Sequence, residues 1–237
     1  MGLFRPKKSE NQYVSNTTPE QLDLFEQLDR TVVIAVKEGS PQINGALHLC
    51  ITQEGYERAA AALELTGKNS GPYQAALGMG LDTVLQQEGY RALVIYGLAG
   101  NQIDFVLTKE DLEPMKDVVD SFCILCAAAR GAMPAEKAWE RMASKTVWFL
   151  GELPQTGRSG ERFGFVTLQR EGGYEAVKAF LTQGSAKRFN QEGYPVTPAR
   201  VADLEKFLEG TFALILEPHR NYWLEFGAES AKGSGGG

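Results

Sequence analysis

The chain has 237 residues, of which 43% are hydrophobic and 23% charged, a composition typical of a globular protein. Its 30 acidic and 24 basic residues give a formal net charge of −6, so the chain lacks the basic balance that nucleic-acid binding requires. No apolar run is long enough to span a membrane, and the polar start lacks the apolar core of a secretory signal. We therefore expect a cytoplasmic protein with no nucleic-acid or membrane partner, and the three cysteines show no disulfide-framework spacing.

Residues 1–30 are predicted to form a polar arm followed by a short helix. Thr18 suits the N-cap position and Pro19 the first helical position, and apolar residues then recur at helical spacing up to residue 29. We expect this amphipathic helix to pack on the first domain.

Residues 31–130 are predicted to form the first of two repeats. The pattern predicts strands at 31–37 and 46–52, helices at 54–65 and 73–87, and a hairpin of strands at 91–96 and 102–107. Thr108 then begins a long helix that extends to about residue 130, with the Asp111 carboxylate reinforcing its cap.

Residues 131–144 are predicted to connect the repeats, with a helix at about 135–143. The second repeat, residues 145–227, is predicted to contain strands at 145–152 and 162–168, a helix at 171–181 and a less defined segment at 186–194. Thr197 then caps a helix at 198–208, and a hairpin of strands at 211–217 and 222–226 closes the repeat. Residues 228–237 have the composition of a flexible linker.

The evidence for a repeat is an echo between residues 47–63 and 164–180. In each segment an apolar run leads to Gly-Tyr-Glu, and neighbouring strands recur in the same order at a nearly constant separation. We therefore predict an α+β fold of two similar β-β-α-α-β-β units, each a small, mainly antiparallel sheet with helices on one face. Tyr56 and Tyr174 are predicted to lie at the first turn of equivalent helices and to pack on the preceding strand.

Residue types that could carry catalysis are few. Cys123 and Cys126 form a CxxC pattern, but they lie in the middle of an apolar helical segment, which favours buried structural cysteines over a redox pair. His48 lies in a predicted strand on the face opposite its leucine neighbours, which favours an exposed or hydrogen-bonded histidine. No catalytic residue, metal ligand or cofactor is assigned from the sequence.

The most unusual local run is at residues 217–223, in the turn and outgoing strand of the last hairpin. Arginine and aromatic residues at a turn are residue types that anchor interfaces, although alternation along the strand must bury some of them in the core. The candidate partner- or ligand-binding residues are Glu217, His219, Arg220, Asn221 and Tyr222.

Two short patterns mark the second repeat: the strand end Phe165-Val166-Thr167 before a helix, and the Ala-Leu-Ile-Leu-x-Pro strand at residues 213–218. In these patterns the chain resembles the SseB family of small bacterial α+β domains, although the family tends to carry Asn where this chain has Glu217. The resemblance covers the second repeat best and the first more loosely. Because such domains act as non-enzymatic modules, the resemblance implies a binding function and supplies no catalytic residues.

We therefore expect a non-catalytic, cytoplasmic protein-interaction or regulatory module built from two SseB-like domains, with an unidentified protein partner. One alternative is a sensor that binds a small molecule between the repeats, where an amino acid is suggested only by the family name. Another is a small hydrolase or transferase that uses carboxylates or His219 near the second hairpin.

Overall fold

The structure is a computed structural model that describes residues 13–18, 31–36, 40–65, 74–97, 104–153, 164–208 and 210–227. The predicted N-terminal helix at 19–29 and the tail at 228–237 lie outside the described residues. The chain divides into two compact units, residues 1–114 and 115–237, so the dividing point falls within the long helix, residues 108–130, that the sequence assigned to the first repeat. The α+β class is confirmed in both units.

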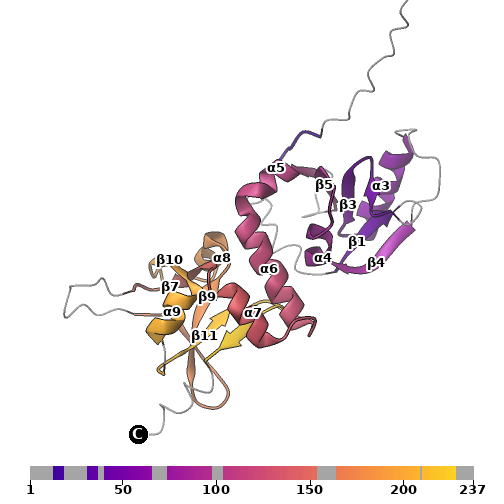
Figure 1. The fold of residues 1–237 in the computed structure, drawn as a ribbon. Helices are drawn as coiled ribbons and strands as arrows, with labels where there is room; N and C mark the ends of the chain where they lie inside the picture. The colour runs from indigo at the N-terminus through magenta and orange to yellow at the C-terminus, as the bar shows by residue number, and fades with distance from the viewer. Residues whose placement is uncertain are drawn as a thin grey trace, which may run out of the picture. The chain divides into compact units, whose positions relative to one another are not determined.

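The first unit is built on one mixed sheet (Figure 1). The strands follow the order β4-β1-β3-β5-β6, with β2 paired to β3; β3 and β5 are parallel and the other pairs are antiparallel. Its elements are β1 (Thr31–Val36), β2 (Gln42–Ile43), β3 (Ala46–Cys50), α3 (Gln53–Leu65), β4 (Gln74–Gly80), α4 (Leu81–Leu85), β5 (Ala92–Tyr96), β6 (Phe105–Thr108) and α5 (Lys109–Leu112).

The second unit begins with two helices and continues into a second mixed sheet. The strand order is β10-β7-β9-β11-β12, with β8 paired to β9; β9 and β11 are parallel and the other pairs are antiparallel. Its elements are α6 (Lys116–Ala129), α7 (Ala135–Met142), β7 (Thr146–Leu150), β8 (Thr167–Gln169), β9 (Glu175–Phe180), α8 (Gln183–Arg188), β10 (Val196–Arg200), α9 (Val201–Leu208), β11 (Ala213–Leu216) and β12 (Leu224–Phe226).

The two sheets share one topology, in which every strand of the first unit has a counterpart with the same partners and directions in the second. The register makes Cys50 equivalent to Phe180, because each is paired with the middle of the first strand of its sheet. Two residues later, Thr52 and Thr182 each accept a hydrogen bond of 3.0 Å from the backbone N–H three residues further on. The unit is thus repeated, and each helix after the third strand is capped in the same way.

The predicted equivalence of the two Gly-Tyr-Glu segments is wrong. Tyr56 lies inside helix α3, whereas Tyr174 precedes strand β9 after the turn at Gly173. The ring contact predicted for Tyr174 is present, since the ring is buried against Leu168, Ala176 and neighbouring residues. The equivalent helix starts are instead Thr52-Gln53 and Thr182-Gln183, which the sequence echo missed by about a dozen residues.

Two predicted helices are strands, so the element order of each unit is β-β-β-α-β-α-β-β. Residues 73–87 form β4 and the short α4, and residues 171–181 form the end of a turn and β9. Both segments contain helix-favouring residues such as Ala and Leu, but differences in helix propensity amount to less than about 1 kcal/mol per residue. Strand pairing outweighs this preference, because β9 is paired with β7, β8 and β11.

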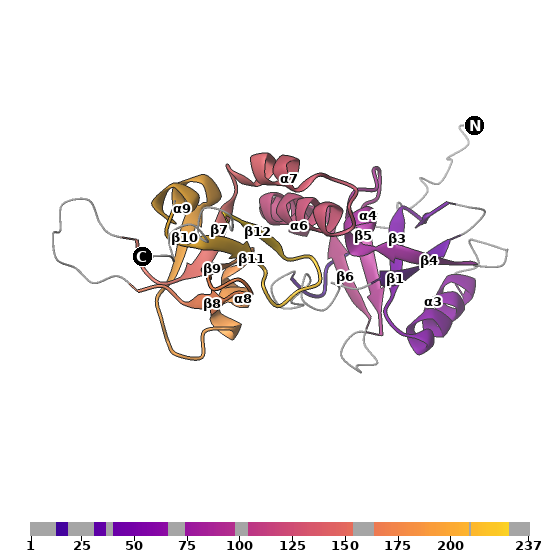
Figure 2. The same ribbon diagram turned by 90° about the horizontal axis from the view of Figure 1, so that it is seen from below.

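Helices cover both faces of the second sheet, whereas the sequence predicted one. Ala186 of α8 packs with Phe180 on one face of β9, and Leu208 of α9 lies with Leu214 and Phe226 on the other. Trp139 of α7 also stacks on Phe226, with 3.6 Å between ring centroids. Figure 2 shows α8 on one side of the sheet and α7 and α9 on the other.

The predicted long helix from residue 108 to 130 is interrupted by a 3-10 turn, Glu113–Met115. Its start agrees with the sequence, since the Thr108 N–H donates to the Asp111 carboxylate at 2.8 Å. Pro114 lacks the N–H that a continuous helix requires, which accounts for the break. Cys123 and Cys126 are buried in α6, as the sequence indicated.

Candidate functional site

The five residues predicted from the 217–223 run do not form one surface. All belong to the turn between β11 and β12, but this turn sends its side chains in different directions. Glu217 and Tyr222 are buried, Arg220 is half-buried, and His219 and Asn221 are exposed. Of the five candidates, only His219 and Asn221 are therefore exposed, and the five do not form a continuous interface.

The side chain of Glu217 supplies a hydrogen-bond acceptor for the backbone at the end of the sheet. Its φ of 50° takes the backbone into the left-handed region, and its carboxyl group, in a residue that is 3% exposed, accepts a 2.7 Å hydrogen bond from the Leu181 N–H. In the first unit the equivalent Ile51 N–H donates to the backbone carbonyl of Tyr96 at 3.0 Å. Burial raises the pKa of the Glu217 carboxyl group to about 7, against the lowering effect of the Leu181 N–H. This carboxyl group has a structural role.

Tyr222 belongs to the core of the second unit. Its ring is 2% exposed and meets the edge of Phe122 of α6 at a centroid distance of 5.1 Å. The prediction that alternation along the strand buries some residues of this run in the core is therefore confirmed for Tyr222. Trp223, its neighbour in the same run, is 45% exposed and packs over the Arg170 guanidinium.

His48 is sealed inside the first unit. The residue is 4% exposed, and its Nδ1 atom lies 3.0 Å from the Tyr96 hydroxyl oxygen, so it is the hydrogen-bonded histidine that the sequence allowed. Burial lowers the pKa of His48 to about 4, which keeps the ring neutral at physiological pH. A substrate cannot reach this ring without a change in the sheet.

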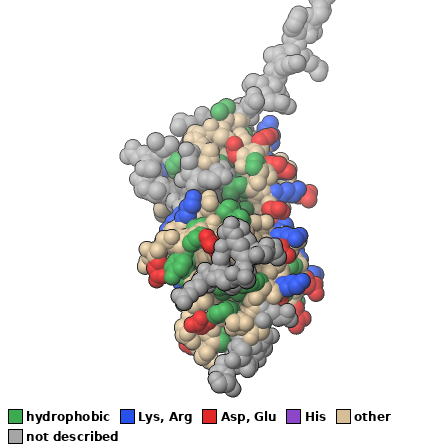
Figure 3. All heavy atoms as spheres, turned by 90° about the vertical axis from the view of Figure 1, so that its left-hand side faces the viewer, with side chains coloured by type: hydrophobic (Ala, Val, Ile, Leu, Met, Phe, Trp, Pro, Cys, Tyr) green, Lys and Arg blue, Asp and Glu red, His purple; other side chains and the backbone are tan. Residues whose placement is uncertain are grey.

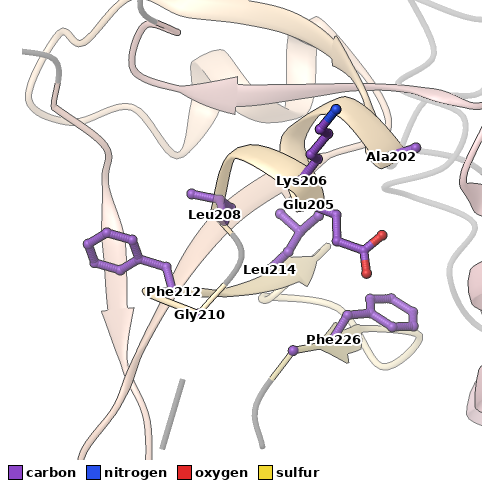
Figure 4. Close-up of a pocket in the computed structure, with 9 residues that line it drawn as sticks. Ala202, Glu205, Lys206, Leu208, Gly210, Phe212, Leu214 and Phe226 are labelled. Carbon is purple, nitrogen blue, oxygen red and sulfur yellow. The ribbon is translucent and has the colours of Figure 1, made fainter. Parts of the chain in front are cut away.

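A groove with a mixed apolar and polar lining, which the sequence did not identify, lies beside α9 in the second unit. It consists of two adjacent hollows of about 300 Å³ and about 400 Å³ that share Leu208 and Phe212 in their walls. Phe226 and Leu214 lie in the first hollow, and Figure 4 shows Phe212 and Phe226 on opposite sides of Leu208. We call these two hollows together the α9 groove.

The α9 groove exists because α9 ends above strands that continue past it. Gly210, with a φ of 76°, follows the helix and reverses the chain into β11, which leaves the sheet beyond Leu208 without a helical cover. Phe165, Phe207 and Phe212 line this second hollow, and Phe207 is 38% exposed. The rings of Phe165 and Phe207 lie 5.6 Å apart in a tilted arrangement.

Each hollow carries one carboxylate. In the first, Glu205 accepts a hydrogen bond of 3.1 Å from the indole N–H of Trp139, and Figure 4 shows its carboxylate beside the Phe226 ring. In the second, Glu175 accepts a hydrogen bond of 3.2 Å from the Thr167 hydroxyl. Lys206 also lines the first hollow, but its ammonium group extends away from Phe226 (Figure 4).

One sequence signal could have indicated this groove. Helix α9 buries Val201, Leu204 and Leu208 on a regular apolar stripe. Phe207 lies outside that stripe, and a large aromatic residue on the polar face of a helix is a feature of interaction surfaces. The hollow itself was not predictable, because it depends on where β8 and β11 pass beneath the helix.

Three other features of the described residues bear on function: basic areas, metal ligands and membrane-spanning helices. On the face shown in Figure 3, the described acidic and basic side chains are interspersed, and they form no large basic area. Among the described residues, no group of three or more His, Cys, Asp or Glu side chains could hold a metal ion. No helix in the described part of the chain is long and apolar enough to cross a membrane.

Comparison with known proteins adds no relative: no family model matches the chain, and neither a curated protein nor a solved structure matches it.

Proposed function

We propose that the chain is a non-catalytic binding module whose α9 groove holds an apolar segment of a protein partner, flanked by basic residues. The observation that carries this proposal is the groove itself, two joined hollows with aromatic and aliphatic side chains in a partly polar lining and an exposed phenylalanine, Phe207, in the second hollow. Volumes of about 300 to 1,000 Å³ are typical of sites that take up a ligand.

The shape of the groove favours an extended segment with two anchoring side chains. Its two hollows meet at Leu208 and Phe212, so neighbouring apolar side chains of one peptide can enter one hollow each. Burial of apolar surface contributes about 25 cal/mol for each Å² removed from water. Aromatic residues such as Phe207 are among those that contribute most to interfaces.

The charges of the groove favour basic residues beside those anchors. Glu205 and Glu175 place one carboxylate in each hollow, while the Lys206 ammonium group is directed away from the floor of the first hollow. A lysine or arginine next to each apolar anchor would meet these carboxylates at the rim. Such complementarity selects partners and registers more than it adds affinity.

The position of the titratable groups supports binding over catalysis. Glu217, whose pKa is raised to about 7 by burial, is 3% exposed and lines neither hollow of the groove. His48 is sealed in the first unit. The alternative function, a small hydrolase or transferase, therefore cannot use the Glu217 carboxylate as a reacting group in this groove. The resemblance to bacterial SseB-like domains and a cytoplasmic location belong to the same proposal.

The test uses phage-displayed random dodecapeptides selected on the whole protein. We expect enrichment of peptides that carry two apolar residues flanked by Lys or Arg. Synthetic versions of these peptides should bind in fluorescence polarisation. Ala202→Trp fills the first hollow and Thr211→Trp the second, and each should weaken binding about tenfold or more, since anchor pockets dominate interface energies.

The matched control is Lys187→Trp, which places the same side chain on an exposed position of α8 outside the groove. Thermal unfolding of each variant shows that the fold is intact. Glu205→Gln and Glu175→Gln should weaken binding of the basic peptides. The part of the binding free energy that does not change with salt concentration should stay the same. Selection of peptides that lack basic flanks would contradict the role of Glu205 and Glu175. Binding that survives both groove-filling substitutions would exclude the α9 groove as the binding surface.

A further inference from the structure

A second, smaller cavity lies on the other side of the sheet, beside the 217–223 turn. It has a volume of about 170 Å³, and its polar lining includes Lys178 and His219. Its apolar lining is formed by Leu150, Val166 and Phe189. Neither Glu217 nor the α9 groove belongs to it, so it is independent of the proposed peptide site.

His219 is held at the mouth of this cavity by a stack of three rings. The buried ring of Phe180 stacks on Phe189 at 5.6 Å, and Phe189 stacks on His219 at 4.1 Å. The backbone of the turn is fixed by the Arg220 N–H, which donates to the Glu217 carbonyl at 3.0 Å. The imidazole is therefore oriented before any ligand arrives.

The opposite wall is also fixed. Asn190 accepts a 2.9 Å hydrogen bond from the Tyr194 N–H, and its side-chain amide donates to the Tyr194 carbonyl, which closes the loop of residues 190–194. This loop contributes one carboxylate, Glu192, to the lining. The cavity is thus a formed site with a defined polar and a defined apolar side.

The charged groups around His219 are of both signs: Lys178 and Glu192 line the same cavity, and the Arg220 charge also acts on the ring. The residue is exposed as a whole, but burial of its stacked ring lowers the pKa of His219, and the charges of Lys178 and Arg220 lower it further. Of these two cations, Lys178 itself lines the cavity beside His219. A negatively charged ligand there would gain from both, and it would favour the protonated imidazole.

We propose that this cavity binds a small organic carboxylate, with its carboxylate at Lys178 and His219 and its hydrocarbon part against the half-buried Val166 and Phe189. The apolar side separates this class from inorganic phosphate, which has no group to place there. The volume, well below that of typical drug-sized sites, limits the ligand to a short chain or a single ring.

The chain offers a direct readout, because it has two histidines and the buried His48 serves as an internal reference. The ring proton signals of both are followed by NMR while butyrate or benzoate is added at constant ionic strength. We expect a saturable shift of the His219 signal with a rise in its pKa, and no change at His48. Butyramide and benzamide, which lack the charge, should produce no such shift.

Variants assign the effect to the cavity. Lys178→Met should weaken carboxylate binding about tenfold or more, because hydrogen bonds to charged groups commonly exceed one decade in affinity, and Lys178→Arg should retain binding. Lys187→Met, on the exposed side of α8, is the matched control and should bind as the wild type does. A shift that grows linearly without saturation, persists in Lys178→Met, or is matched by inorganic phosphate would overturn the proposal.

Discussion

The replacement of Glu217 by Gln tests how a buried carboxyl group affects stability. The side chain is 3% exposed and its carboxyl group accepts the Leu181 N–H at 2.7 Å, a hydrogen bond that the amide oxygen of Gln can also accept. Glu217→Gln therefore removes the group that ionises and keeps the size and shape of the side chain. Burial is the main cause of the raised pKa, so the difference between the two proteins should depend on pH.

The magnitude follows from the pKa, which rises from an ordinary value of 4.5 to about 7. Between these two values the unfolded chain releases the proton while the folded protein retains it, so the folded state loses stability as the pH rises. At about 1.4 kcal/mol for each pH unit, the loss reaches about 3 kcal/mol above pH 7. The Gln variant should match the wild type near pH 4 and exceed it by about 3 kcal/mol at pH 8.

Urea unfolding followed by tryptophan fluorescence measures this difference at each pH. Glu171→Gln, which changes an exposed carboxylate in the same unit, reports the background. A constant difference between wild type and Glu217→Gln across pH 4 to 8 would show that Glu217 ionises in the folded protein as it does in the unfolded chain. The assignment of a buried, protonated carboxyl group would then be wrong.

Two further substitutions test the packing of the repeated unit. Gly55→Ala in α3 should destabilise the protein by about 1 kcal/mol or more although alanine favours helices, because its Cβ atom would lie 2.9 Å from the Tyr96 carbonyl oxygen. Gly184→Ala in α8 is the matched control; its Cβ atom would meet only the Thr182 hydroxyl at 3.9 Å, and thermal unfolding should show unchanged or slightly raised stability. Tyr174→Phe should lower the free energy of unfolding by about 1 to 2 kcal/mol, since it removes the 2.7 Å hydrogen bond from the tyrosine hydroxyl to Glu225, whereas an unchanged urea midpoint would show that this bond contributes nothing.

Much of the local structure is determined by the sequence alone. The β-branched and aliphatic runs form β1, β5, β7 and β11 where they were predicted, because such residues favour pleated, buried backbone in any context. The cap at Thr108 is also local, since Asp111 needs only one helical turn to reach its backbone. The repeated strand order was detectable for the same reason, as these strands recur in the same order along the chain.

Other elements depended on contacts between distant residues. The segment that forms β9 has helical propensity, and only pairing with strands on both sides makes it a strand. The true helix equivalence, Thr52-Gln53 with Thr182-Gln183, is present in the sequence as a short Thr-Gln match. A two-residue match is too short to be recognised in a sequence alignment of the two repeats. The longer Gly-Tyr-Glu match is preferred until the register of β3 and β9 is known.

The candidate sites were the least predictable part of the molecule. Residue types identified the 217–223 run, but whether a side chain is buried like Glu217 or exposed like His219 depends on the left-handed backbone at the turn. The α9 groove depends on Gly210 ending the helix above strands that continue beyond it. Propensity and periodicity act within one segment, whereas a cavity is the space left between several, and only the tertiary structure decides where that space lies.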